Sequence, residues 1–422
     1  MNGADHDTSR LATALDGEAF WQNMQDSAAI GRRCGGGIKR LALDDADIEA
    51  RRWLITRGEA LGCQAYFDDA ANVFIRREGQ DPTAAPLLLG SHLDSQPAAG
   101  IYDGALGVIS GLAVLQTVAA LDMAHRRPIE LVSWTNEEGA RFTPGMTGSS
   151  VFAGAANLDT LGDACDADGI RLRDALNATL AALAATRALQ RAQAPQPYAY
   201  LETHIEQGPV LEEQGLPVGV VTGIQGVRWF RFTVTGVAGH AGTTPRSLRQ
   251  DAFDGACRLA NTLRETATDT EEQVRFTIGR FEVEPGAVNT IPDRVTFTVD
   301  LRHPNATKLE ALEASFRQLS RRDWAGCHVQ LERLIDKAPI AFPTDLTDLL
   351  ANSVTTAGLP AAPRMMSGAF HDALYLASIC PTAMLFVPCE AGISHHPSEH
   401  VEKADAIAAC RVLAAAVEQL LD

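Results

Sequence analysis

Apolar residues in the first part of the chain recur at spacings that predict alternating helices and strands. Residues 46–64 and 106–121 carry apolar positions every three to four residues, which is typical of helices packed on a core. A stretch rich in Ala and Leu, 170–194, predicts a further helix. Short apolar runs are typical of buried strands, and they occur at 72–75, 86–89 and 129–134. Because strands and helices alternate, we expect a mostly parallel sheet with helices on its faces.

The pattern changes near Leu216-Pro217, where alternating apolar and polar positions replace the buried runs. Alternation of this kind predicts amphipathic strands, at 229–234, 274–278 and 294–299. Helical spacing predicts two helices between and after them, at 246–267 and 306–322. This combination predicts a small α+β domain of the ferredoxin-like type, with one open face of its sheet.

The helix–strand pattern of the first part resumes after Pro339, and residues 382–387 are typical of another buried strand. The simplest organisation is therefore an α/β domain interrupted by a smaller inserted domain. We place the first part of the α/β domain at 1–215, the inserted domain at 216–335 and the second part at 336–422.

Length and composition narrow the class of protein. A chain of 422 residues is too long for one ordinary core, and 46% hydrophobic with 21% charged residues is typical of a soluble globular protein. The net charge of −17 argues against a nucleic-acid-binding surface or an anionic-membrane surface, either of which needs a basic patch. Acidity of this kind usually serves solubility alone.

Cysteine usage and the N-terminal stretch bear on location. The 8 cysteines show no CxxC spacing, which indicates reduced thiols and a cytoplasmic protein. The polar N-terminal stretch lacks the apolar centre of a signal peptide. The most hydrophobic long stretch, 106–123, is interrupted by Gly111, Gln116 and Asp122, so it predicts a buried helix and no membrane span.

Four segments place ionisable side chains where regular structure should end. They are GSHLDSQPAAGIYDGALGV (90–108), WTNEEGARF (134–142), LETHIEQGP (201–209) and GISHHPSE (392–399). In open α/β sheets, ligands bind at the carboxyl ends of strands, so these segments can converge. Together they offer three imidazoles and two carboxylates, from His92, Asp103, Glu138, His204 and His395.

This donor set suits zinc, and with more oxygen donors also manganese or cobalt. A carboxylate such as Asp103 can bridge two metals about 3.5 Å apart, the usual spacing of a two-metal hydrolytic site. Each segment by itself has a simpler interpretation. A lone histidine such as His92 is more often structural, and Glu137-Glu138 alone is more often the solvated start of a helix. The coincidence of four such segments favours the metal site.

The same segments carry a family resemblance, together with GVAGHAGTTP, GAVNTIPDRVTFTVDLRH and SGAFHDA. From about residue 30 to the C-terminus the chain resembles the metal-dependent amidohydrolases of the hydantoinase/carbamoylase type. This group includes N-carbamoyl-L-amino acid hydrolases, β-ureidopropionases and allantoate amidohydrolases, within the M20 metallopeptidase clan. The resemblance implies a homodimer whose inserted domain pairs with its counterpart, acts as a lid and lends residues to the partner's site.

The resemblance also implies roles for individual residues at the metal site. The five donors named above match ligands of two divalent ions, bridged by Asp103, with zinc favoured and manganese, cobalt or nickel as alternatives. Glu137 matches the general base, which takes a proton from the attacking water and later gives it to the leaving nitrogen. Asp94 can accept the second ring N–H of His92 and fix its tautomer. Peptidases of the clan generally carry a carboxylate at the position of His204. The histidine in this chain therefore favours amide or ureido substrates over peptides.

Further matches concern the substrate. Gln207 matches a residue that contacts the ureido group, because an amide can both donate and accept. His240 matches a histidine that stabilises the oxyanion. Asn289 and Arg302 match the pair that holds the substrate carboxylate, where the planar fork of arginine fits well. Without the resemblance, Gln207 and Arg302 would be interpreted as surface residues.

The sequence therefore predicts hydrolysis of the carbamoyl C–N bond of an N-carbamoyl-L-amino acid or a related ureido acid. An N-acyl amino acid hydrolase or dipeptidase of the same clan is one alternative. A non-catalytic, metal-dependent binding protein is another. Departures from the family pattern at Ile101-Tyr102, Arg246 and Phe370 leave the substrate side chain open.

Overall fold

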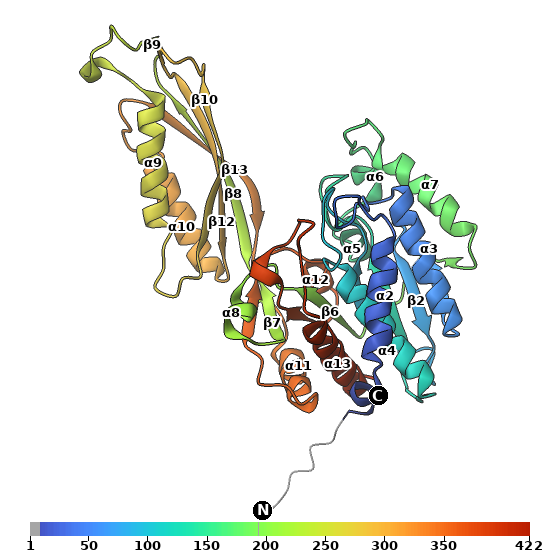
Figure 1. Cartoon of the computed structure of the whole chain (residues 1–422). Coiled ribbons are helices and arrows are strands. Elements are labelled where there is room, and N and C mark those ends of the chain that lie inside the picture. Colours follow the sequence, from blue (N-terminus) through green and yellow to red (C-terminus); the bar gives the residue numbers. More distant parts are fainter. Residues whose placement is uncertain (1–8, 193) are drawn as a thin grey trace, which may run out of the picture. The chain divides into compact units, whose positions relative to one another are not determined.

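The computed structural model describes residues 9–192 and 194–422, so part of the polar N-terminal stretch lies outside the described residues. The chain divides into two compact units (Figure 1). One contains the described residues up to Thr222 together with Phe342–Asp422, and the other is Gly223–Ala341. Both divisions lie a few residues beyond the boundaries expected from hydropathy, because the polypeptide continues into strand β7 (Gly219–Ile224) after the change in composition at Leu216-Pro217.

The first unit is built on a large mixed sheet whose centre is parallel. Strands β16, β6, β3 and β4 lie side by side and run parallel to one another. In spatial order the sheet contains β14 (Ile340–Ala341), β7, β16 (Thr382–Val387), β6 (Ala199–Ile205), β3 (Leu87–His92), β4 (Ile129–Trp134), β2 (Val73–Arg77), β1 (Gln64–Phe67) and β5 (Leu189–Gln190), with β15 (Arg364–Ser367) also paired to β7. A parallel centre brings the carboxyl ends of its strands to one edge.

Helices bury one face of this sheet in a continuous apolar core. They are α1 (Arg10–Ala14), α2 (Gly17–Ala29), α3 (Asp45–Ala60), α4 (Ala105–Ala120), α7 (Leu172–Ala184), α11 (Thr344–Thr356) and α13 (Lys403–Leu420). Helix α4 is apolar on nearly all sides, and a helix of that kind must be buried. On the opposite face, α5 (Thr147–Phe152) and α12 (Ala373–Leu376) contact the sheet beside a cluster of aromatic rings.

Helix α7 is shorter than its composition suggests. The predicted helix at 170–194 ends at Ala184, and the prediction was wrong over its second half. The Thr186 hydroxyl donates to the Leu183 carbonyl, which satisfies an acceptor at the helix end. Leu189–Gln190 then pairs with β1 as strand β5, so contacts outside the helix override the local preference for Ala and Leu. Among the described residues, no helix combines the length and apolar character needed to cross a membrane.

The second unit has strand–helix–strand–strand–helix–strand order. Its antiparallel sheet contains β10 (Arg275–Glu284), β12 (Arg294–His303), β8 (Gly226–Thr235) and β13 (His328–Lys337), in that spatial order. Helices α9 (Ala252–Thr266) and α10 (Ala306–Leu319) cover one face, around phenylalanines of the strands and of α10. This is the ferredoxin-like arrangement. The predicted fold class, a mixed α/β domain with a separate small antiparallel domain, is therefore confirmed.

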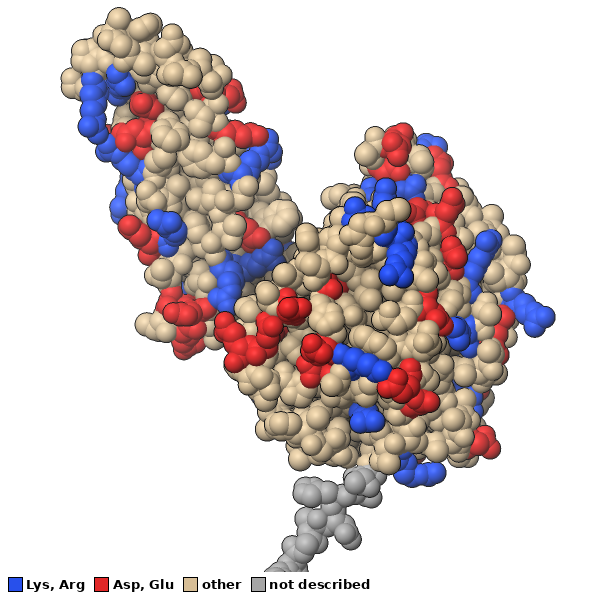
Figure 2. Space-filling view, viewed as in Figure 1, with Lys and Arg blue, Asp and Glu red and all other residues tan. Residues whose placement is uncertain are grey.

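Helix α9 begins later than the predicted 246–267. Asp251 accepts the backbone N–H groups of Phe253 and Asp254 and so caps the helix start, while Arg246–Leu248 forms a short 3-10 turn. On the face shown in Figure 2, acidic and basic side chains are interspersed over both units.

Candidate metal centre

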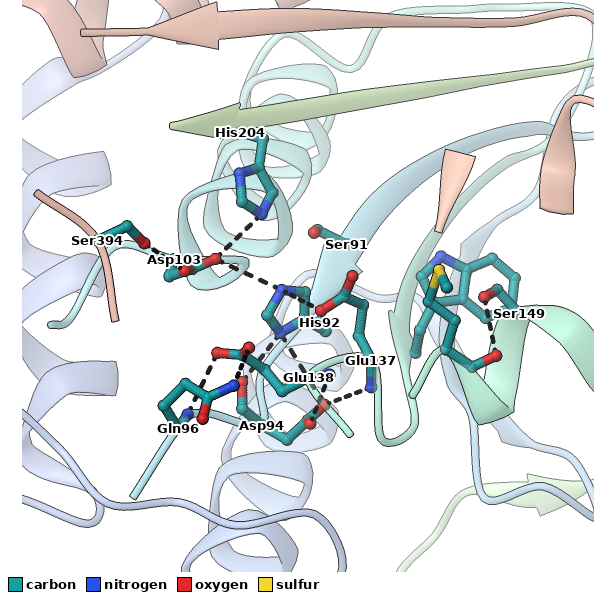
Figure 3. A network of polar contacts seen from close by, with 12 residues as sticks. Ser91, His92, Asp94, Gln96, Asp103, Glu137, Glu138, Ser149, His204 and Ser394 are labelled. Carbon is teal, nitrogen blue, oxygen red and sulfur yellow. Dashed lines mark hydrogen bonds and ion pairs between the residues drawn. The ribbon is translucent and has the colours of Figure 1, made fainter. Parts of the chain in front are cut away.

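The ionisable segments of the first unit converge at the carboxyl ends of β3, β4 and β6 (Figure 3). His92 is the last residue of β3, and His204 lies near the end of β6. Asp103 directly precedes Gly104, the N-cap of α4. A Cβ atom at Gly104 would lie 2.3 Å from His92 Nε2, so a glycine is needed for the start of α4 to approach the imidazole.

Asp103 lies between two groups of possible ligand atoms. Its Oδ1 atom is 3.2 Å from His204 Nε2 and 3.7 Å from His92 Nε2. Its Oδ2 atom is 3.3 Å from His395 Nε2, which in turn is 3.4 Å from Glu138 Oε2. Within each group, one ligand atom from every residue lies within 4.8 Å of the others. The two oxygens of one carboxylate therefore face two separate donor sets.

The tautomers of two histidines follow from their backbone contacts. His92 Nδ1 lies 2.9 Å from the Asp94 carbonyl oxygen, and His204 Nδ1 lies 3.0 Å from the Ile205 carbonyl oxygen. A carbonyl only accepts, so each Nδ1 atom donates its proton. In the neutral imidazole, each Nε2 atom then presents a lone pair toward the centre.

One detail differs from the expected role of Asp94. The residue does orient His92, but through its backbone carbonyl, whereas its carboxylate oxygen is 3.9 Å from Nδ1. The carboxylate instead accepts the backbone N–H groups of Glu137, at 3.2 Å, and Glu138, at 3.3 Å. The prediction of a carboxylate–imidazole contact was wrong because the turn after β4 uses both oxygens of Asp94.

These contacts provide a test of whether the residues fit a metal ion. His92 Nε2 is buried and has no hydrogen-bond partner, and it lies 3.3 Å from Glu137 Oε2 and 3.7 Å from Asp103 Oδ1. Burial, with His204 nearby, lowers the pKa of His92 to about 4, so the ring is neutral near pH 7. A lone pair facing carboxylate oxygens is unfavourable unless a cation lies between them. The donor set therefore fits a divalent cation.

The remaining groups also change one another's protonation. Burial by itself would raise the pKa of Asp103, but hydrogen bonds from His204 and His395 outweigh burial and hold it well below its usual range. Burial by itself would lower the pKa of His204, but the hydrogen bond to Asp103 raises it to about 9. Burial raises the pKa of Glu138 to about 8, and Asp103 adds to the effect. Without a cation, the cluster therefore holds protons on groups that a metal would need as ligands.

Adjacent glutamates after β4 have different surroundings. Glu138 Oε2 accepts from Gln96 Nε2 at 2.8 Å, and Glu138 Oε1 accepts from the Gln96 backbone N–H at 3.2 Å, which fixes this carboxylate. Glu137 Oε2 lies 3.3 Å from His92 Nε2. Burial raises the pKa of Glu137 well above its usual range, with the nearby Asp372 as the next cause. A carboxyl group beside the candidate ligands with a raised pKa has the properties of a proton carrier.

Gln207 lies against the centre with its two amide atoms in different situations. Its Nε2 atom donates to Asp103 Oδ2 at 3.0 Å and to Ser394 Oγ at 3.2 Å. Its Oε1 atom is buried and has no hydrogen-bond partner. The amide oxygen is thus available to a donor that the protein does not supply. The backbone of Gln207 is in the left-handed region, at φ 56°.

A third donor group, Glu202, His204 and His371, lies deeper in the first unit. Glu202 already accepts from the Ser91 hydroxyl at 2.7 Å, the Tyr200 hydroxyl at 3.1 Å and the Ala373 backbone N–H at 3.1 Å. Because its oxygens are used by the protein, we interpret this group as a structural network beneath the metal centre.

Sequence reasoning missed three residues of the centre: Gln96, Ser394 and Glu399. All three lie inside the segments that drew attention, but the sequence analysis assigned them no role. Gln96 holds Glu138, and the Ser394 hydroxyl donates to Asp103 Oδ2 at 2.8 Å. Glu399 accepts the backbone N–H of Asp103. No sequence signal identifies such contacts, because each partner is at least 42 residues away along the chain.

The substrate-binding candidates of the second unit do not lie together. His240 in β9 (Gly239–His240) pairs with Thr290 in β11 (Thr290–Ile291), and the Ala241 N–H donates to the Asn289 carbonyl, so His240 and Asn289 are neighbours. Arg302 lies near the far end of β12, eight residues beyond Arg294, or roughly 26 Å at 3.3 Å per residue. Its guanidinium binds Asp300 through two nitrogens. Asn289 and Arg302 of the same chain therefore do not form the joint carboxylate site that the resemblance implied.

Comparisons with known proteins agree with this architecture. Residues 88–419 match the model of peptidase family M20/M25/M40. The chain is 38% identical over 409 residues to an N-carbamoyl-L-amino acid amidohydrolase of Geobacillus stearothermophilus, covering 96% of this chain and 99% of that protein. It is 32% identical to allantoate deiminase 2 of Glycine max, and the match covers 91% of this chain and 86% of that protein. A crystal structure of an amidase of the hydantoinase/carbamoylase family from Burkholderia multivorans is similar to this structure with a TM-score of 0.90 and is 37% identical in sequence. The match covers 97% of this chain and 98% of that chain. This chain therefore belongs to peptidase family M20/M25/M40 and, within it, to the amidohydrolases of the hydantoinase/carbamoylase type.

Proposed function

We propose that this protein hydrolyses the carbamoyl C–N bond of an N-carbamoyl-L-amino acid or a closely related ureido acid, using two divalent metal ions. One observation carries the proposal: the two oxygens of Asp103 face two separate sets of donor atoms, one fully buried and one that includes the half-exposed His395. A two-metal hydrolytic site needs such a bridging carboxylate. The names of the similar amidohydrolases support the choice of substrate class.

His92, Asp103 and His204 would hold one ion, and Asp103, Glu138 and His395 would hold the other. We propose zinc first, because imidazole and carboxylate donors suit it, with manganese, cobalt and nickel as alternatives. Ions bound there would polarise the scissile carbonyl and lower the pKa of a water molecule.

The chain's own residues supply the proton transfer and the orientation. Glu137, next to His92 and free of the contacts that fix Glu138, accepts a proton from the attacking water and delivers it to the departing amino nitrogen. The unpartnered Gln207 Oε1 accepts a ureido N–H, which relieves a buried acceptor that the protein leaves unsatisfied. The products are the free amino acid and a carbamate, which decomposes to carbon dioxide and ammonia.

The substrate carboxylate and the oligomeric state are linked in this proposal. Asn289 and Arg302 lie at opposite ends of the second unit, so one carboxylate cannot bind both residues of the same chain. A homodimer in which a second copy supplies one of the two residues resolves the conflict. The copy that supplies Asn289 would also supply the neighbouring His240.

We also propose a cytoplasmic location, since the 8 cysteines of the chain are all free thiols in the structure.

A substrate panel tests the proposal. Metal-free protein is reloaded with zinc, manganese, cobalt or nickel and assayed against N-carbamoyl, N-acetyl and dipeptide derivatives of one amino acid, and against allantoate. We expect kcat/KM to be highest for a ureido substrate. Preference for the dipeptide or the acetyl derivative would assign the chain to the alternative hydrolases. Thermal stabilisation by ureido acids without any hydrolysis would indicate a binding protein.

A further inference from the structure

Glu399 connects two loops of the metal centre that are almost 300 residues apart in the chain. Its side chain is buried, and the residue is 5% exposed. The Oε1 atom accepts the backbone N–H of Tyr102 at 3.0 Å and that of Asp103 at 3.1 Å. The Oε2 atom lies 3.3 Å from the hydroxyl of Ser394. One carboxylate thus contacts both the loop that carries Asp103 and the loop that carries His395.

The chain is shaped to let Glu399 approach the first of these loops. A Cβ atom at Gly100 would lie 2.3 Å from Glu399 Oε1 and 2.4 Å from Glu399 Cβ. Contacts that short are not tolerated, so any other residue at this position would push the glutamate away. The absence of a side chain at Gly100 therefore allows Glu399 to approach the loop before Asp103.

Ser394 extends the connection to the bridging carboxylate itself. Its hydroxyl lies 2.8 Å from Asp103 Oδ2 and 3.3 Å from Glu399 Oε2. A hydroxyl has one proton, so it donates to one carboxylate at a time, and both carboxylates lie within its reach. The next residue, His395, has a backbone in the left-handed region at φ 56°, a conformation that needs support from its surroundings.

We propose that Glu399 is a positioning residue that holds the bridging carboxylate Asp103 and the ligand loop of His395 in register with each other. The inference rests on the proposed function, since it takes these residues as ligands. Glu399 reaches Asp103 through its backbone N–H, and it reaches His395 through the adjacent Ser394.

The two ions should depend on Glu399 to different extents. The group His92, Asp103 and His204 contains one residue that Glu399 positions, namely Asp103. The group Asp103, Glu138 and His395 contains that residue and also the loop anchored through Ser394. Loss of Glu399 therefore weakens the second ion more than the first.

Three variants test the inference. Glu399→Ala removes all three contacts. In Glu399→Gln, the amide oxygen still accepts from the backbone of Tyr102 and Asp103, and the amide nitrogen donates to Ser394, which keeps its own proton for Asp103. Glu402→Ala is the matched control, because this side chain lies three residues along the same segment, is 76% exposed and forms an ion pair with His400 at 3.6 Å.

Zinc titration of each metal-free protein gives the first readout. We expect the second zinc ion to bind about 10- to 100-fold more weakly in Glu399→Ala, with the first ion less affected. Glu399→Gln and Glu402→Ala should remain close to the parent protein. Equal binding in Glu399→Ala and the parent would overturn the inference. Equal losses in Glu399→Gln and Glu399→Ala would also overturn it, because charge and not position would then matter.

Backbone amide exchange of the metal-free proteins gives a readout that needs neither metal nor activity. Exchange at Tyr102 and Asp103 should be about tenfold faster or more in Glu399→Ala, and close to the parent rate in Glu399→Gln. Unchanged exchange in Glu399→Ala would contradict the positioning role. If exchange changes as expected but the parent protein binds no zinc, the contacts of Glu399 are as described and the proposed metal function fails.

Discussion

The carboxylate of Asp94 accepts the backbone N–H of Glu137 at 3.2 Å, and through this contact it sets the turn that carries the candidate base. Its second oxygen accepts a hydrogen bond from the backbone N–H of Glu138 at 3.3 Å, and the backbone carbonyl of Asp94 orients His92. One buried residue thus holds one metal-ligand candidate from β3 and the two candidate glutamates after β4. These groups must keep fixed distances for hydrolysis to occur.

Replacement of Asp94 by Asn should therefore impair catalysis without removing the metal ligands. An amide has one acceptor oxygen, so one of the two backbone N–H groups loses its acceptor and the turn shifts. We expect kcat to fall about 10- to 100-fold, with less effect on the first metal ion. Steady-state kinetics and metal analysis of the same preparation provide the check. Parental kcat in the variant would show that the turn does not depend on this carboxylate.

Glu137→Gln should retain both ions and lose activity. The amide keeps the size of the side chain but cannot take the proton from water, so we expect kcat to fall by a factor of about 10² to 10⁴. Metal content is measured in parallel, and Glu402→Gln, at an exposed position, serves as the control. A Glu137→Gln protein with bound metal and intact activity would remove Glu137 from the role of base.

Chelation of the metal should destabilise the folded protein. Asp103, Glu137, Glu138 and Asp94 place four carboxyl groups within one buried site, and divalent ions offset their mutual repulsion. Because ions bind the folded state, removing them should lower the midpoint of thermal unfolding. Calorimetry with and without chelator measures the shift. The same chelator should have little effect on Asp103→Asn, which lacks the bridging carboxylate, and an equal shift in both proteins would contradict the site.

A buried ion pair in α3 should contribute more to the free energy of unfolding than an exposed ion pair. Arg51 and Asp47 are fully buried and 2.9 Å apart in α3, and Asp47 also accepts the Leu43 N–H. Arg51→Leu leaves the Asp47 carboxylate without its charged partner, which should cost about 3 to 5 kcal/mol in the free energy of unfolding. Urea denaturation measures this, with Arg171→Ala as control, because Arg171 and Asp174 pair while half exposed. Similar losses in the two variants would contradict the argument from burial.

Much of the fold could be predicted because periodicity reports burial directly. Strands 129–134 and 382–387 were predicted with the bounds that the structure has, since both are mostly apolar and all of their residues are buried. Helix ends were less predictable. The end of α7 and the start of α9 depend on pairing with β1 and on capping by Asp251, neither of which appears in hydropathy.

The sequence by itself determined the order of the elements, the presence of an inserted α+β domain and the residue types that follow the central strands, because these depend on local spacing along the chain. Only the tertiary structure decided which atoms meet. In the folded chain the Glu137 backbone N–H donates to the Asp94 carboxylate, and Glu399 contacts a loop almost 300 residues away. Asn289 and Arg302 lie apart. Hydrogen bonds act over about 3 Å, so their partners are set by packing between distant segments and not by position in the sequence.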